Sequence, residues 1–167
     1  MNVEGTKNEN VKYFKNRARN CIYIYQKRSY LDKQIEELEY RIKGISAVDS
    51  SKTHDCFDPK QREYANLVLM EKKDILVARK RACDDYIRWI FRVVSRCPKD
   101  KRPYIVSIYL ERKKIEAISE EAGIPMTRMS HDISVALNDA ITEKDINMMD
   151  GIMSVLSEHD PQMAKMI

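Results

Sequence analysis

The chain has 167 residues and a formal net charge of +4, with 43% hydrophobic and 34% charged residues. This composition supplies enough apolar surface for a core, and it excludes a disordered chain. Only 4 Gly and 5 Pro are present, which favours long helices because both residues interrupt them. No stretch approaches the roughly 18 apolar residues of a membrane span, and residues 1–20 lack the apolar segment of a signal peptide. We therefore expect a cytoplasmic, all-α protein without membrane contact.

The charge is unevenly distributed along the chain. Residues 1–103 contain 24 Lys and Arg against 15 Asp and Glu, whereas residues 104–167 contain 6 against 11. A basic front and an acidic back can steer a molecule toward a polyanion or toward an oppositely charged protein. The balance of charge does not decide between these two partners.

A first long helix is expected over about residues 9–43, which contain neither Gly nor Pro. Apolar residues recur in it at spacings of three and four, the pattern of a coiled-coil seam. They are Leu31, Ile35, Leu38, Ile42 and Ile45. Gly44 is expected to end this helix.

Residues 46–59 are small and polar and predict a loop, with Asp58 as N-cap and Pro59 as the first residue of a second helix. That helix is expected over 60–96. Its apolar stripe consists of Tyr64, Val68, Ile75, Ala78, Ala82, Trp89 and Val93, with Glu71 and Asp85 as polar exceptions. Since neither helix can bury its stripe alone, we expect an antiparallel hairpin; self-association of the first helix is the alternative.

A linker with two prolines, Pro98 and Pro103, separates an N-terminal hairpin domain (1–98) from a C-terminal domain (99–167). Shorter helices are expected over about 103–112, 114–122, 126–141 and 142–159. Thr142 begins the last of these with a capping-box pattern. That helix has a methionine-rich face, which either closes the core of the C-terminal domain or binds a partner or second copy. The face consists of Met148, Met149, Ile152, Met153 and Leu156.

The segment from Ile115 to Leu137 has the spacing of a helix-turn-helix. Ser119 is a small residue where two helices cross, and Gly123, four residues later, supplies the positive φ that a sharp turn needs. The inner face of the second helix is expected to consist of Met129, Ile133, Ala136 and Leu137.

The pattern Y-L-x(7)-I-S-E-E-A-G-I-x(4)-M-x(6)-A-L, which starts at Tyr109, resembles region four of sigma-70 factors. More particularly, it is similar to phage late-gene transcription regulators of the ArpU/RinA type. The likeness covers nearly the whole chain in architecture and about 35 residues in motif. It implies a regulator that works in a host cell on promoter DNA, on RNA polymerase, or on both.

The sequence departs from the sigma-like pattern at three positions. Ser119 replaces the usual Ala. Pro125 stands where a Ser or Thr normally caps the recognition helix, so Thr127 is expected to take over the capping. Asp132 replaces an inward-facing apolar residue, and Ile133 is expected to serve in its place.

The resemblance implies that a polar face of the second helix enters the major groove while basic residues before the first helix contact phosphates. The groove residues are Thr127, Arg128, Ser130, His131 and Ser134, and the phosphate contacts are Arg112, Lys113 and Lys114. Residues 111–150 contain only five basic residues against nine acidic ones, so DNA binding would draw on dimerisation, the basic N-terminal half or RNA polymerase.

Two further basic sets have competing interpretations. Arg88, Arg92 and Arg96 recur every four residues and share one helix face. This face either binds DNA phosphates or an acidic groove of a protein, or it is a solvated surface. Residues 13–30 interleave basic and aromatic side chains, which either stack on single-stranded bases or pack in the core.

No pattern of residues indicates catalysis, so we expect no enzyme, no small-molecule substrate and no cofactor. His54, His131 and His159 are far apart and lack partners at any familiar catalytic spacing. His54 and Cys56 form the only local pair of metal-ligand residues, and no metal site is expected. The remaining function hypotheses are the transcription regulator and, as the alternative, a phage-encoded interaction factor that inhibits or adapts a host protein and uses the helix-turn-helix only as a scaffold.

Overall fold

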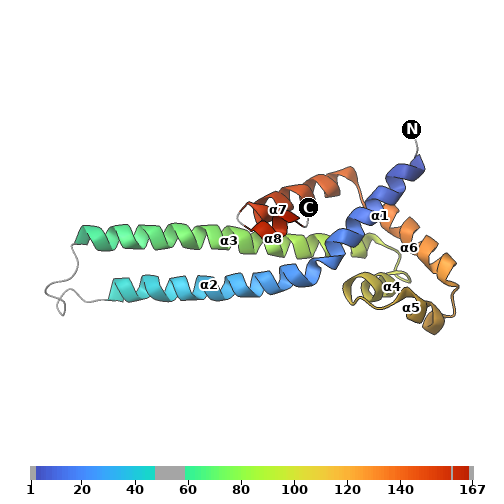
Figure 1. Ribbon diagram of the computed structural model, residues 1–167, viewed down its shortest axis with the longest axis horizontal. Helices are drawn as coiled ribbons and strands as arrows, with labels where there is room; N and C mark the ends of the chain where they lie inside the picture. Colours follow the sequence, from blue (N-terminus) through green and yellow to red (C-terminus); the bar gives the residue numbers. More distant parts are fainter. Residues whose placement is uncertain (1–2, 48–58, 159, 166–167) are drawn as a thin grey trace.

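The computed structural model describes residues 3–47, 59–158 and 160–165 (Figure 1). All regular secondary structure in these residues is helical, which confirms the all-α prediction. No helix among them is both long and apolar enough to cross a membrane. The loop expected at 46–59 falls mostly outside the described residues, as does the expected N-cap Asp58.

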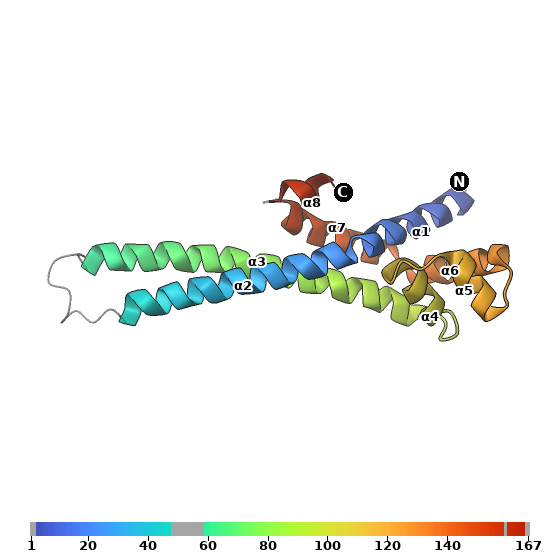
Figure 2. The ribbon, with the colours of Figure 1, turned by 60° about the horizontal axis from the view of Figure 1, so that its bottom comes forward.

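Two long helices, α2 (Cys21–Ala47) and α3 (Pro59–Arg96), run antiparallel and side by side (Figures 1 and 2). The predicted seam residues Leu31, Ile35 and Leu38 are buried between them. Ion pairs along the hairpin fix its register: Arg28 with Asp84, Lys80 with Asp32 at 2.5 Å, and Lys73 with Glu39 at 3.2 Å. These pairs are half-exposed, so their main contribution is alignment rather than stability.

The single helix expected from residue 9 to residue 43 is wrong. Helix α1 (Val3–Arg19) ends before Asn20, whose backbone N–H donates to the Arg17 carbonyl at 3.2 Å, and α2 then starts in a new direction (Figure 1). The physical reason is packing, because Phe14 and neighbouring apolar residues of α1 are buried against Trp89 and against the helices that follow α3. Gly44 also does not end α2, which continues to Ala47.

The C-terminal helices agree closely with the expected ranges. They are α4 (Arg102–Ile105), continued by the π-helical segment η1 (Val106–Leu110), then α5 (Ile115–Ala122), α6 (Met126–Ala140), α7 (Glu143–Ser157) and α8 (Pro161–Lys165). The predicted capping box is confirmed. The Asp145 N–H donates to Thr142 Oγ1 at 3.3 Å, and the Thr142 N–H donates to Asp145 Oδ2 at 2.9 Å.

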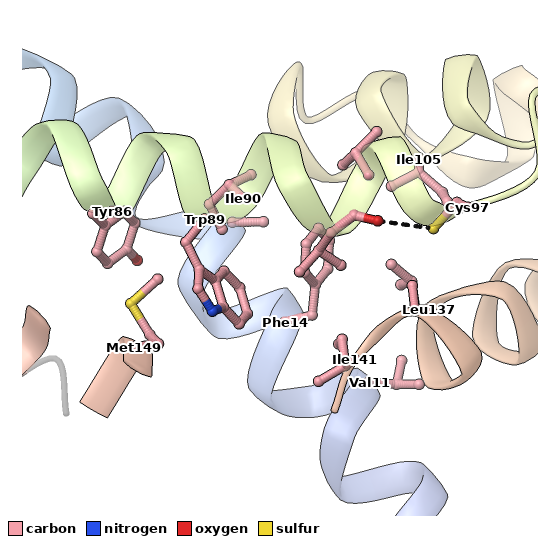
Figure 3. Packing of buried hydrophobic residues seen from close by; sticks show 14 of the residues in the cluster. Val11, Phe14, Tyr86, Trp89, Ile90, Cys97, Ile105, Leu137, Ile141 and Met149 are labelled. Atoms are coloured by element: carbon pink, nitrogen blue, oxygen red, sulfur yellow. Dashed lines mark hydrogen bonds between the residues drawn. The ribbon is translucent and has the colours of Figure 1, made fainter. Parts of the chain in front are cut away.

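Trp89 of α3 lies at the centre of the core (Figure 3). Phe14 stacks on its ring at 6.3 Å between centroids, and Tyr13 meets it edge-on at 6.1 Å. The indole Nε1–H donates to the Asp145 carbonyl of α7 at 2.8 Å. One turn away, the Tyr86 hydroxyl donates to the Arg17 carbonyl at 2.6 Å. The two large aromatics thus bury their rings without leaving their polar atoms unpaired.

The methionine-rich face of α7 packs within the chain. Met149, Met153 and Leu156 are buried against α3, whereas Met148 remains 42% exposed. The same buried cluster includes Val11 of α1 and Leu137 of α6. The core therefore contains residues on both sides of the boundary expected at residue 98, with α3 as the shared element.

We predict that Trp89→Phe destabilises the protein by about 1–3 kcal/mol, since it removes the hydrogen bond from the indole to the Asp145 carbonyl and part of the ring volume. Urea unfolding followed by circular dichroism measures this change. Phe91→Leu, at a position 53% exposed on the same helix, is the control and is expected to change stability by less than about 0.5 kcal/mol. Equal effects of the two substitutions would contradict the central place of Trp89.

Candidate nucleic-acid interface

Helices α5 and α6 meet at a turn built around Gly123, as the sequence predicts. Gly123 has φ +66° and ψ +26°, the left-handed region, and its N–H donates to the Glu120 carbonyl at 3.2 Å. The Ile124 N–H donates to the Ser119 carbonyl at 3.1 Å. An added Cβ at Gly123 would meet no atom within 4 Å, so the glycine is needed for its backbone conformation rather than for space.

The side chains expected to share the inside of this corner are buried. Ser119 is 6% exposed, and its hydroxyl donates to the Glu116 carbonyl at 2.9 Å, so the polar group is satisfied. Met129, Ile133 and Leu137 are 2%, 1% and 0% exposed. Helix α6 also packs on α1, which the sequence did not predict. Its orientation is thereby fixed from two sides.

Two expectations about the start of α6 have different outcomes. Thr127 does not cap the helix, because the N-cap is Pro125, which has no side-chain hydrogen bond, and Thr127 lies inside the helix. That expectation is wrong. Ile133 does replace Asp132 on the inner face, and Asp132 instead lies half-buried with its carboxylate 3.4 Å from Lys101 Nζ.

The expected groove-facing residues lie on the outside of α6. Thr127, Arg128, Ser130 and His131 are exposed, and Ser134 is half-buried. The Arg128 side chain is 75% exposed, and its guanidinium lies 3.9 Å from Asp132, a distance at which the attraction is weak. A rigid helix therefore presents hydroxyl, imidazole and guanidinium groups, the donors and acceptors that read base edges.

The expected phosphate contacts precede α5 and are all exposed: Arg112, Lys113 and Lys114. Arg112 has a positive φ of 55°, and its guanidinium donates to the Arg19 carbonyl at the end of α1 at 2.6 Å. Lys113 lies 3.0 Å from Glu111, whose hydrogen bond and charge raise the pKa of the lysine. The structure thus attaches this segment to α1 rather than to α6.

The second basic set, Arg88, Arg92 and Arg96, is exposed along α3, but its members have different contacts. Arg88 is 74% exposed, with Asp85 at 3.7 Å. Arg96 is committed to the fold, since it donates to Asp145 at 2.5 Å and to the Ala140 carbonyl at 3.2 Å. Arg96 therefore joins α3 to the start of α7.

A surface groove of about 460 Å³ connects two of the sequence-predicted sets. Arg96 and Lys101 line one side of it, and His131, Asp132 and Asp139 of α6 line the other. Arg96 at the end of α3 and Lys101 in the turn before α4 thus place two cations beside the outer face of α6. The two aspartates offset part of this charge.

The sequence did not predict that a basic face of α1 lies beside residues 112–114. Lys12, Lys15 and Arg19 are exposed and follow one another at spacings of three and four, so they share one side of the helix. Lys15 Nζ lies 5.7 Å above the ring of Tyr109, and Arg19 is bonded through its carbonyl to Arg112. The spacing of three and four residues could have indicated that these basic residues share one side of a helix. Their closeness to residues 112–114 depends on the change of direction at Asn20, which the sequence did not predict.

The aromatic side chains of residues 13–30 divide between the two interpretations. Phe14 is fully buried, and Tyr13 is half-buried with its hydroxyl donating to Asp150 at 2.6 Å. Burial is the main reason that the pKa of Tyr13 is raised. Tyr25 and Tyr30 are 60% and 55% exposed. Core packing therefore accounts for Tyr13 and Phe14, but it does not account for Tyr25 and Tyr30.

The described residues contain no group of three His, Cys, Asp or Glu side chains placed to hold a metal ion. His54, Cys56 and His159 lie outside them. Cys21, Cys83 and Cys97 are free thiols. Burial raises the pKa of Cys83 to about 11, which keeps the thiol protonated and unreactive at neutral pH.

Comparisons with known proteins give no relative for this chain. No protein-family model matches it, and no significant match was found among curated proteins or among solved structures.

We predict that Gly123→Ala destabilises the protein by about 1–2 kcal/mol, because alanine is strained at a positive φ. Thermal unfolding measures the change. Gly151→Ala is the matched control, since Gly151 also has open space for a Cβ but lies within α7. Alanine is the better helix former there, so this variant is expected to gain up to about 1 kcal/mol. Equal losses in both variants would contradict the proposed role of the turn.

The pH dependence of stability is expected to reveal the contact between Arg96 and Asp145. Burial by itself would raise the pKa of Asp145, but hydrogen bonds from Thr142 and the charge of Arg96 lower it below its ordinary value. The folded state therefore binds this proton less readily than the unfolded chain does. The ionised Asp145 carboxylate therefore stabilises the folded state fully above the pKa of an aspartate in the unfolded chain, about 3.9. This stabilisation is lost as the pH falls through the lower pKa that Asp145 has in the folded state.

Asp145→Asn is accordingly expected to have a lower free energy of unfolding than the wild type at neutral pH. The difference between variant and wild type is expected to disappear in acid, where Asp145 of the wild type is protonated. Urea unfolding of the variant and the wild type over a pH series tests this expectation. Asp139→Asn, at an exposed acidic position of α6, is the control and is expected to run parallel to the wild type. A deficit of Asp145→Asn that is constant with pH would show that the carboxylate charge contributes nothing.

Proposed function

We propose that this chain is a phage-type transcription regulator that binds promoter DNA, RNA polymerase, or both, through α5 and α6. One observation carries the proposal. The turn at Gly123 and the burial of Met129, Ile133 and Leu137 hold α6 rigidly, with Arg128 and His131 on its outer face. A rigid helix with a polar outer face is what major-groove recognition requires.

The distribution of basic residues supports the same proposal. The C-terminal segment alone is acidic, but α1 adds Lys12, Lys15 and Arg19 beside residues 112–114. The turn between α3 and α4 adds Lys101 beside α6, where it lies 3.4 Å from Asp132. Phosphate neutralisation by Lys and Arg provides most of the affinity that does not depend on sequence. Elements on both sides of residue 98 would therefore contribute to one DNA-binding surface.

Salt-dependent binding of the full chain to a labelled mixed-sequence duplex tests the electrostatic part. The logarithm of the affinity is expected to fall linearly with the logarithm of the salt concentration, and Lys113→Ala and Lys114→Ala are each expected to reduce that slope by about 1. Lys33→Ala, at an exposed position of α2, is the control and is expected to leave the slope unchanged.

Arg128→Ala tests the base-reading part. Sequences selected by the wild type from a random library serve as specific sites, and the mixed duplex serves as the reference. The variant is expected to weaken binding to the selected sequences by about 1–3 kcal/mol and to weaken binding to the reference much less. Equal losses on both would remove Arg128 from base recognition.

A second function, an interaction factor that occupies a host or phage protein, is favoured by one specific observation. The outer side of α5 is acidic, with Glu116, Glu120 and Glu121 all exposed. Such a surface repels phosphates and suits a basic protein partner. Absence of DNA binding at low salt, together with capture of a defined partner that survives nuclease treatment, would favour this function over the regulator.

A further inference from the structure

The groove between α6 and the end of α3 holds a cation and a carboxylate of this chain against each other. Lys101 Nζ lies 3.4 Å from Asp132 Oδ2, a distance at which the two charges attract each other directly. The Lys101 side chain is 21% exposed, and the Asp132 side chain is 30% exposed. Water and salt therefore screen this pair less than they screen an ion pair on an open surface.

The backbone around the groove holds both partners in place. Lys101 is the N-cap residue of α4, and its backbone N–H donates to the Pro98 carbonyl at 3.0 Å. At the end of α3, the Cys97 thiol contacts the carbonyl of Ala136, a residue of α6 that also lines the groove, at 3.8 Å. The turn that carries Lys101 and the helix that carries Asp132 are thus joined independently of the ion pair.

The pair lies on the side of α6 that the proposed DNA contacts occupy. His131, the neighbour of Asp132, is exposed and lines the same groove. Arg128, one helical turn earlier, lies 3.9 Å from the same carboxylate. A duplex whose bases contact Arg128 and His131 brings the phosphates that border its major groove toward this edge of α6. Lys101 is therefore placed where it could pair with a phosphate.

We propose that Asp132 withholds Lys101 from DNA and thereby lowers the affinity of this chain for duplexes of any sequence. This rests on the proposed function, since it concerns the same DNA-binding surface. The Asp132 carboxylate occupies the place at the ammonium group that a phosphate oxygen would take. A phosphate must displace the carboxylate before it pairs with Lys101, and the displaced carboxylate then repels it.

The packing of α6 does not account for Asp132. Ile133 takes the inner position and is 1% exposed, so the core of α6 is complete without the carboxylate. The remaining structural role would be to attach α6 to the turn before α4. A role of that kind predicts that loss of the carboxylate loosens α6 and weakens DNA binding. The proposal predicts the opposite, because loss of the carboxylate releases Lys101.

Asp132→Asn in the full chain, bound to a labelled mixed-sequence duplex over a series of salt concentrations, tests the proposal. Asparagine keeps the size of the side chain and removes its charge. One additional phosphate contact steepens the dependence of the logarithm of the affinity on the logarithm of the salt concentration by about 1. The variant is therefore expected to show this steeper slope and to bind roughly five- to tenfold more tightly near 0.1 M salt.

Asp139→Asn is the matched control. It removes one negative charge from the same helix and the same groove, but Asp139 is exposed and does not pair with Lys101. Its removal is expected to change the affinity by less than about twofold, because salt screens an exposed charge. The double variant of Lys101→Ala with Asp132→Asn is expected to return the slope to near its wild-type value. Asp132→Ser is expected to behave as Asp132→Asn does, and thermal unfolding shows that each variant is folded.

Three results would overturn the proposal while leaving the proposed function intact. They are an affinity of Asp132→Asn at or below that of the wild type, an equal gain in Asp139→Asn, and a double variant that keeps the steeper slope. If neither the wild type nor Asp132→Asn binds the duplex at low salt, the proposed DNA binding and this role of Asp132 are both overturned. Binding by Asp132→Asn alone would support the proposal most strongly.

Discussion

The structure depends on one stripe of α3 that must be covered from outside the hairpin. Trp89 and Tyr86 present more apolar area than α2 can cover, so α1 and α7 pack over them. Each aromatic also carries one polar hydrogen, and each finds a backbone carbonyl in the helix that covers it, Asp145 in α7 and Arg17 in α1. The fit between α3, α1 and α7 is therefore specific as well as hydrophobic. Because α6 packs on α1 and α3, its position depends on the same stripe.

Local signals in the sequence were sufficient for most of the helices. The extent of α3, the capping box at Thr142, the left-handed Gly123 and the buried face of α6 are each encoded within a few residues, and the structure agrees with all of them. The break at Asn20 was missed because no Gly or Pro marks it. It exists since Phe14 is buried against Trp89, a residue 75 positions later in the chain. Periodicity within one helix contains no information about that contact.

The sequence predicted the part of the candidate site that depends on one helix and did not predict the part that depends on contacts between distant residues. The exposure of Arg128 and His131 followed from the helical period of α6. The closeness of Lys12, Lys15 and Arg19 to residues 112–114 could not be recognised, because it depends on long-range contacts such as the bond from Arg112 to the Arg19 carbonyl. Arg96 is a similar case. The four-residue spacing places Arg96 on the same exposed side of α3 as Arg88 and Arg92, but it contains no information about the bond from Arg96 to Asp145, an acid that also belongs to the α7 capping box.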